Sequence, residues 1–214
     1  LHKEYRRQRQ MCIRDSFILT RGSQRRADID VEGYDRIFTG ESRVQALDFW
    51  MRYPEYLADE LLNLFEETGD STYLTEARRI FDLNEPDLRT VPMIRFYFGA
   101  YEPLDTVLAI LKSRGLVLPR SRLTAMGRKG HEFLISPTAV ALLDRMVAEL
   151  PPLIWYENRV ALVLKVAGNR GGYPLKIRQH ERREYHNTRI EDLIPTTAGR
   201  VHRRLKMILE REMA

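Results

Sequence analysis

Cysteine is almost missing from this chain of 214 residues, in which Cys12 is the single example. One cysteine excludes an intramolecular disulfide bond and any zinc site that is built from several cysteines. Disulfide bonds belong to oxidising compartments, whereas thiols stay reduced in the cytoplasm. We therefore expect a cytoplasmic protein.

Long apolar runs are also lacking. The longest runs, such as residues 160–164, are far shorter than the ~20 apolar residues that a membrane helix needs. The first residues are charged, where a secretory signal would require an apolar core. Apolar residues still make up 43% of the sequence, which is close to the share of an ordinary globular domain. We expect a packed globular protein with no membrane partner.

Motifs that would identify an enzyme are missing as well. The sequence contains neither the Gly-x-Ser-x-Gly elbow of serine hydrolases nor the His-Glu-x-x-His motif of zinc enzymes. Residues 168–172 read GNRGG, without the spacing or the Lys-Ser/Thr ending of a P-loop. His180 and His186 stand six residues apart, not the four that would place them on one helical face. We expect no enzyme, no metal and no cofactor, although a fold never excludes an unfamiliar activity.

Charge is distributed unevenly along the chain. The overall net charge is +5, but residues 31–110 carry a net −9 and residues 111–214 a net +10. Such asymmetry indicates a polyanionic partner for the basic part. It is equally compatible with two parts that face each other within the fold or across a dimer.

The first residues of the chain are left out of the functional prediction. Residues 9–16 read RQMCIRDS, which resembles translated sequencing-adapter sequence, so residues 1–16 have the character of an artefact. Residues 17–33 show no sustained periodicity of either helix or strand. We therefore expect a poorly determined leader over residues 1–33.

Helical periodicity begins after residue 40 and defines an N-terminal helical segment over residues 34–70. The pair Tyr53-Pro54 interrupts it, because proline disfavours helical geometry in the preceding residue and suits the first turn of a new helix. The second helix ends near Gly69. A short helix is predicted after Ser71, then a turn at residues 84–86 and another helix over about residues 88–97.

Residues 102–150 carry the most informative pattern. A helix over residues 103–114 has its apolar residues on one face and ends at Gly115, which readily takes the left-handed conformation. Residues 116–118 and 131–135 read as two strands around a basic hairpin, PRSRLTAMGRKG, at residues 119–130. Ser136 and Pro137 are typical of the start of a further helix.

This order of elements resembles winged helix-turn-helix regulators of the MarR and PadR type, over about residues 72–150. The resemblance is one of pattern, carried by Leu108, Leu111, Arg114, Gly115, Leu116, Val117, Phe133, Ile135, Ser136 and Pro137. It implies a mainly α fold with a small β-hairpin wing. The winged-helix core would lie at residues 71–152, between flanking N- and C-terminal helices, with a recognition helix at residues 103–114 in the DNA major groove.

The predicted nucleic-acid contacts lie in the wing and in a basic C-terminal helical region, residues 153–214. Seven of the fourteen residues at 176–189 are Lys, Arg or His, and such groups neutralise phosphate. The predicted contacts are Arg120, Arg122, Arg128 and Lys129 in the wing and Lys176, Arg178, Arg182 and Arg183 after it. The first turn of the predicted recognition helix argues against nucleic-acid binding. Glu102 and Asp105 would repel phosphate, and no side chain there is suited to contact a base edge.

The leading hypothesis is a non-catalytic DNA- or RNA-binding protein, a transcriptional regulator. The alternative is a winged-helix protein-interaction adaptor subunit of a multi-component bacterial defence-type system, which the acidic first turn favours. A last helix after Thr197 aligns Val201, Leu205 and Ile208 in one stripe. The stripe fits docking on the core or a homodimer. We expect a homodimer, because regulators of this type read two half-sites.

Overall fold

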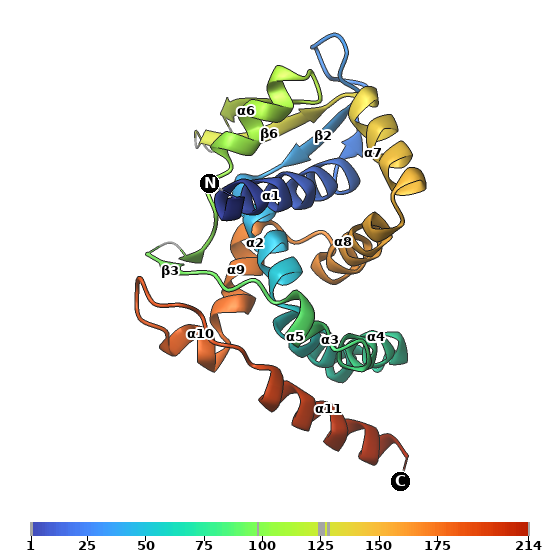
Figure 1. Cartoon of the computed structure of the whole chain (residues 1–214), viewed down its shortest axis with the longest axis vertical. Helices are drawn as coiled ribbons and strands as arrows, with labels where there is room; N and C mark the ends of the chain where they lie inside the picture. Colours follow the sequence, from blue (N-terminus) through green and yellow to red (C-terminus); the bar gives the residue numbers. More distant parts are fainter. Residues whose placement is uncertain (1, 98, 124–126, 128, 214) are drawn as a thin grey trace.

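The computed structural model describes residues 2–97, 99–123, 127 and 129–213, and for residues 2–10, Arg122 and Lys129 it describes the backbone alone. In Figure 1 the sheet, α6 and α7 lie at one end of an elongated molecule and α11 at the other. Helices account for 63% of the structure, which confirms a mainly α fold with small antiparallel sheets. The elements are α1 (His2–Arg21), β1 (Gln24–Arg25), β2 (Arg36–Thr39), α2 (Glu41–Arg52), α3 (Pro54–Thr68), α4 (Ser71–Asp82), α5 (Glu85–Arg89), β3 (Arg95–Phe96), β4 (Gly99–Ala100), α6 (Asp105–Ser113), β5 (Val117–Leu123), β6 (Lys129–Ile135), α7 (Pro137–Glu149), η1 (Pro151–Leu153), α8 (Ile154–Ala167), α9 (Gly172–His180), α10 (Arg183–Asn187) and α11 (Ala198–Glu212).

The larger sheet has the order β1-β2-β6-β5 and is antiparallel throughout. β5 and β6 form the predicted hairpin, with Val117 opposite Ile135. β2 pairs with the other edge of β6 and packs Phe38 against Phe133, with ring centroids 6.4 Å apart. β2 reads Arg-Ile-Phe-Thr, with its two apolar residues side by side, so it shows no alternation of apolar and polar residues. For this reason the sequence did not predict β2.

The elements around this hairpin follow the sequence prediction. Gly115 follows the last residue of α6 by two positions and adopts φ +65°, the left-handed conformation that commonly ends a helix. Ser136 caps α7, where its Oγ accepts a hydrogen bond of 3.2 Å from the backbone N–H of Ala139. α6 packs on β5, and α1 packs on β6, α6 and α7. The hairpin is therefore held by the adjacent helix α6 and by α1 from a distant part of the chain.

The N-terminal helices also begin and end where the sequence predicted. α3 starts at Pro54, and Gly69 ends it with φ +72°. α4, α8 and α11 pack against α3, so its carboxylates Glu55, Asp59 and Glu60 are buried together with its leucines. A buried charge is costly unless it is paired, and most of the partners come from the C-terminal third of the chain.

The predicted helix over residues 88–97 is wrong. Only residues 85–89 are helical, as α5, and the chain then runs extended into β3 and β4. Pro92 explains the difference, because proline has no N–H, clashes with the preceding turn of a helix and disfavours helical geometry at Val91. The extended chain pairs with residues 191–194, where Ile94 and Leu193 form an antiparallel bridge.

The last helix docks on its own chain. Val201, Leu205 and Ile208 of α11 are at most 2% exposed, and the helix packs against α3 and α4. Of the two possibilities for this stripe, docking on the core and a homodimer contact, the structure shows docking on the core. The homodimer stays a prediction, but the surface on which it was argued is already covered.

The expected leader, residues 1–33, is helical over residues 2–21, and β1 follows that helix. α1 continues to Arg21 and buries Phe17, Ile18 and Leu19. This part of α1 is enclosed by α2, α6, α7 and α8, so its apolar residues are not confined to one side of the helix. Three consecutive apolar residues show no helical period, and for this reason the sequence does not predict the helix. Buried side chains from all four segments predicted in the sequence belong to one contiguous core. Among the described residues, no helix is long and apolar enough to cross a membrane.

Candidate functional site

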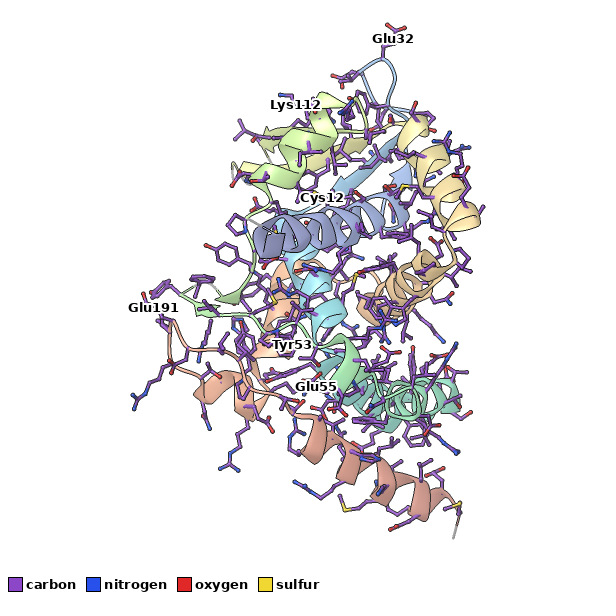
Figure 2. All side chains as sticks on the ribbon, viewed as in Figure 1. Cys12, Glu32, Tyr53, Glu55, Lys112 and Glu191 are labelled. Carbon is purple, nitrogen blue, oxygen red and sulfur yellow. The ribbon has the colours of Figure 1, made fainter. Side chains whose placement is uncertain are left out.

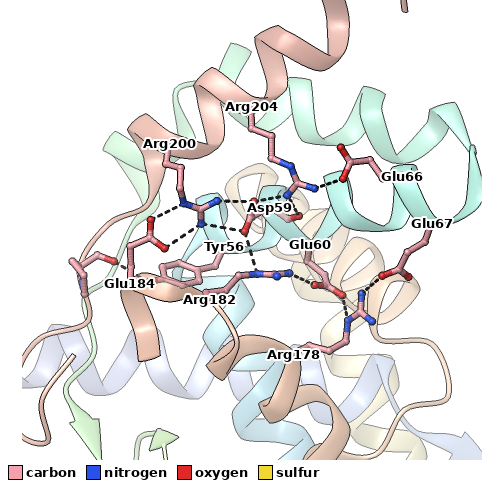
Figure 3. A network of polar contacts seen from close by, with 11 residues as sticks. Tyr56, Asp59, Glu60, Glu66, Glu67, Arg178, Arg182, Glu184, Arg200 and Arg204 are labelled. Atoms are coloured by element: carbon pink, nitrogen blue, oxygen red, sulfur yellow. Dashed lines mark hydrogen bonds and ion pairs between the residues drawn. The ribbon is translucent and has the colours of Figure 1, made fainter. Parts of the chain in front are cut away.

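Two of the predicted phosphate contacts pair with carboxylates of α3. The Arg178 guanidinium binds Glu60 and, through Nη2 at 2.9 Å, Glu67. Arg182 lies beside it, and its Nε is 3.1 Å from Oδ2 of Asp59 while its Nη2 contacts Glu60. Figure 3 shows both arginines pointing at α3. These side chains join α9 and the following turn to α3.

Asp59 is the centre of this network. Besides Arg182, it binds Arg200 at 3.2 Å and Arg204 at 2.7 Å (Figure 3), and its side chain is 2% exposed. Arg200 also holds Glu184 of α10, with Nε 2.6 Å from its Oε1. Burial by itself would raise the pKa of Asp59, but the arginines outweigh it and hold the pKa below its usual range.

The other two predicted contacts in the C-terminal region differ from each other. Lys176 is half-buried, with Nζ 2.8 Å from Oε1 of Gln45 and 5.9 Å from the centre of the Tyr101 ring. Burial lowers the pKa of Lys176. Arg183 is exposed at the start of α10. Of the four, Arg183 alone is an exposed side chain.

The wing contains the remaining predicted contacts. Arg120 on β5 lies between two carboxylates, with Nε 3.0 Å from Glu132 and Nη1 2.8 Å from Asp30. Arg122 and Lys129 lie on β5 and β6, and only their backbone is described. Arg128 falls outside the described residues. Their contact with phosphate stays a prediction.

The first turn of the predicted recognition helix is less acidic on its surface than the sequence indicated. α6 begins at Asp105, so Glu102 lies before it. Glu102 binds the buried Arg52, with Oε2 2.8 Å from Nη1. Asp105 is exposed, and so are Lys112 and Arg114 at the other end of α6. The carboxylate of Glu102 therefore has a structural partner and does not face solvent.

Exposed apolar side chains gather on the β3–β4 hairpin and the segment paired with it. The backbone N–H of Arg95 donates to the Asp192 carbonyl at 2.9 Å, and that of Glu191 donates to the Arg95 carbonyl at 2.7 Å. Glu191 adopts φ +72°, a strained conformation for a non-glycine residue, and lies at the margin of the molecule in Figure 2. We name as the apolar edge Ile94, Phe96, Tyr97, Ile190 and Leu193, whose exposed fractions run from 39% to 79%.

The sequence missed this apolar edge. Ile94 and Phe96 lie in the stretch for which the sequence predicts a helix, and of the apolar residues Ile190, Leu193 and Ile194 only Ile194 is buried. Pro92 was the available signal, because an extended chain after proline alternates its side chains between two faces. No local signal shows that residues 190–194 pair with it.

His180, one of the two histidines considered as metal ligands, packs against an aromatic side chain. The His180 ring stacks on Tyr185, with centroids 4.5 Å apart. Burial, followed by the charge of Arg95, lowers the pKa of His180. Within the described ranges, no group of three or more His, Cys, Asp or Glu residues is placed to hold a metal ion.

Comparisons of the chain with protein-family models, with curated proteins and with solved structures found no match.

Proposed function

We propose that this chain is a non-catalytic adaptor subunit that binds another protein through the apolar edge. The observation that carries the proposal is the gathering of five exposed apolar side chains on two paired segments. Single exposed apolar residues are ordinary, but several on two paired segments suit a contact surface, and here Ile94 lies directly opposite Leu193. The partner presents an apolar surface of its own, since the edge offers burial rather than charge.

The distribution of charge supports an adaptor over a nucleic-acid-binding protein. Binding to nucleic acid releases counterions only where basic groups are available to phosphate. Arg178, Arg182 and Arg120 each have carboxylate partners in the chain. The charge asymmetry of the sequence is thus used, at least around α3, to join an acidic helix to basic helices.

We propose further that α1, α2, α6 and the larger sheet form a winged-helix unit. α6 would take the place of the second helix of the helix-turn-helix, with β5 and β6 as the wing and β2 as the strand on the other side of β6. Residues 54–100 would then be inserted between the two helices. This insertion carries α3 and part of the apolar edge, which makes the unit a scaffold for the contact surface.

The experiment compares two matched double variants of the affinity-tagged full chain, purified from the native host. The edge variant is Tyr97→Ser with Leu193→Ser, at positions 79% and 61% exposed. The control is Leu88→Ser with Tyr173→Ser, at positions 71% and 75% exposed on other elements. Quantitative mass spectrometry measures the co-purified protein, and absorbance at two wavelengths measures nucleic acid.

We expect one stoichiometric protein partner with the wild type and with the control. The edge variant should retain at least about tenfold less of it, since a central apolar contact contributes on the order of 2 kcal/mol. A partner that the edge variant retains in full, or that both variants lose equally, contradicts the proposal. So does nucleic acid that co-purifies without any protein.

Nucleic-acid binding through the wing is the second candidate. It is favoured by Lys112 and Arg114, which are exposed next to the wing and form no ion pair with the described part of the chain. If this is the function, Lys112→Gln with Arg114→Gln should reduce the slope of log K against log salt for duplex DNA by about two units. A wild-type chain with no affinity for DNA at low salt excludes it.

A further inference from the structure

A cavity of about 360 Å³ opens between α4 and α8, on the opposite side of the molecule from β3 (Figure 1). Its volume lies in the range of pockets that bind small molecules. The lining that bears on its chemistry consists of Glu76, Arg79, Glu85, Trp155, Arg159 and Lys165. The apolar edge lies elsewhere, so this cavity is independent of the proposed adaptor surface.

Arg159 is the unusual residue in this lining. Its side chain is 4% exposed, and Nη2 binds the equally buried Glu85. Its Nε and Nη1 have no hydrogen-bond acceptor among the described residues. A guanidinium is always charged and has five N–H donors, and a buried charged donor without an acceptor is strongly unfavourable. An acceptor from outside the chain would complete the hydrogen bonding of Arg159.

The rest of the lining defines the chemistry of this ligand. Arg79 and Lys165 add two exposed cations, so the lining contains three positive and two negative side chains. The Lys165 Nζ lies 3.2 Å from the Thr72 hydroxyl and 5.1 Å from the centre of the Tyr73 ring, and its charge also acts on the carboxylate of Asp70. The excess of positive charge favours an anion.

An aromatic side chain forms part of the cavity wall. The guanidinium groups of Arg159 and Arg89 lie 5.4 Å and 4.7 Å from the centre of the Trp155 ring. Ile80, Leu83 and Leu162 add apolar surface to the lining. The ligand that fits both features has a charged group and an apolar body.

We propose that this cavity binds a small organic molecule through an oxyanion, either a phosphate or a carboxylate. The oxyanion accepts hydrogen bonds from Arg159 and is attracted by Arg79 and Lys165, while the apolar body packs beside Trp155. The Nε and Nη1 atoms of Arg159 are shielded from solvent, so the proposal requires the guanidinium or the Trp155 ring to move when the ligand binds.

The test titrates the full chain with phenyl phosphate, benzoate and inorganic phosphate in a calorimeter, at an ionic strength held constant with sodium chloride. Arg79→Gln with Lys165→Gln removes the two exposed cations and leaves the buried Arg159–Glu85 pair in place. The matched control is Arg203→Gln with Lys206→Gln, two exposed cations of α11. Tryptophan emission gives a second readout, because Trp155 lines the cavity while Trp50 is buried in the core.

We expect saturable binding of phenyl phosphate or benzoate, with a change in tryptophan emission. The cavity variant should bind at least about tenfold more weakly, and the control as tightly as the wild type. Tighter binding of phenyl phosphate identifies a phosphate ligand, and tighter binding of benzoate a carboxylate. Lack of saturable binding of any probe overturns the proposal, and so does equal weakening in both variants.

Discussion

Asp59 shows how single residues decide the electrostatics of this chain. One buried carboxylate contacts three arginines from two places in the C-terminal third, namely Arg182 after α9 and Arg200 and Arg204 on α11. Each of these arginines has a second carboxylate partner, namely Glu60, Glu184 and Glu66. A buried pair of this kind adds little net stability when it is complete, but the loss of one member leaves uncompensated charge.

Replacement of Asp59 by asparagine should lower the free energy of unfolding by about 3 kcal/mol at neutral pH. The pKa of Asp59 is lowered in the folded protein. Its carboxylate therefore stabilises the fold above the ordinary aspartate pKa of about 3.9, and that contribution is lost as the pH falls through the lower folded-state value. Urea unfolding of wild type and Asp59→Asn between pH 7 and pH 3 measures the difference, which should shrink at the acidic end. A difference that grows on acidification contradicts this assignment.

Arg182 and Arg183 are neighbours with different roles. Arg182→Ala should destabilise the protein by about 2 kcal/mol, because Asp59 and Glu60 each lose one partner and keep others. Arg183→Ala, at an exposed position, should change the stability by less than about 0.5 kcal/mol. Thermal unfolding of the two variants compares them directly. Equal stabilities would mean that the Arg182 contacts contribute nothing.

Among the elements, the helix and hairpin at residues 105–135 could be predicted from the sequence. The extended segment after α5, which contains β3 and β4, could not. Gly115 and Ser136 act locally, by a left-handed conformation and a cap, and such signals are readable from neighbouring residues. β2 and the pairing of residues 190–194 with β3 depend on partners far away in the chain. Pro92 excluded a helix at residues 88–97 but did not reveal the pairing.

The junction of α9 with α2 offers a test at this scale. A Cβ at Gly172 would lie 2.4 Å from the backbone nitrogen of Arg43 and 2.2 Å from Oγ of Ser42. Gly172→Ala should therefore destabilise the protein by about 2 kcal/mol, as overpacking of a rigid contact does. Gly171→Ala is the matched control, since a Cβ there meets nothing within 4 Å. Similar unfolding midpoints for both variants would show that the helices do not approach as described.

At the scale of the whole molecule, an acidic part and a basic part of one chain are joined face to face. The sequence left open whether the charge asymmetry serves a polyanion, an internal contact or a dimer. Around α3 it serves an internal contact, because Arg178, Arg182 and Arg204 lie against that helix. Composition alone could not separate these three cases. The net charge of a segment gives the sign of its charged groups, but it does not show which groups lie opposite them in the fold.

The covered stripe of α11 leads to a prediction about assembly. Leu205 is 2% exposed within one chain, so Leu205→Ala should destabilise the protein by about 2–4 kcal/mol through the cavity it creates. It should leave the oligomeric state unchanged, as measured by light scattering at several concentrations. The contradicting result is a wild-type dimer that dissociates when Leu205→Ala is introduced, while the stability of the monomer stays unchanged. That result would support the dimer contact expected from the sequence.

Amide hydrogen exchange on the purified complex, compared with the free chain, tests the central claim most directly. If the apolar edge is the contact surface, peptides that cover residues 93–101 and 188–195 should exchange more slowly in the complex. Peptides of the wing, residues 117–135, should exchange at the same rate in both states. Slower exchange confined to the wing and to the end of α6 would contradict the adaptor proposal and support contact with nucleic acid.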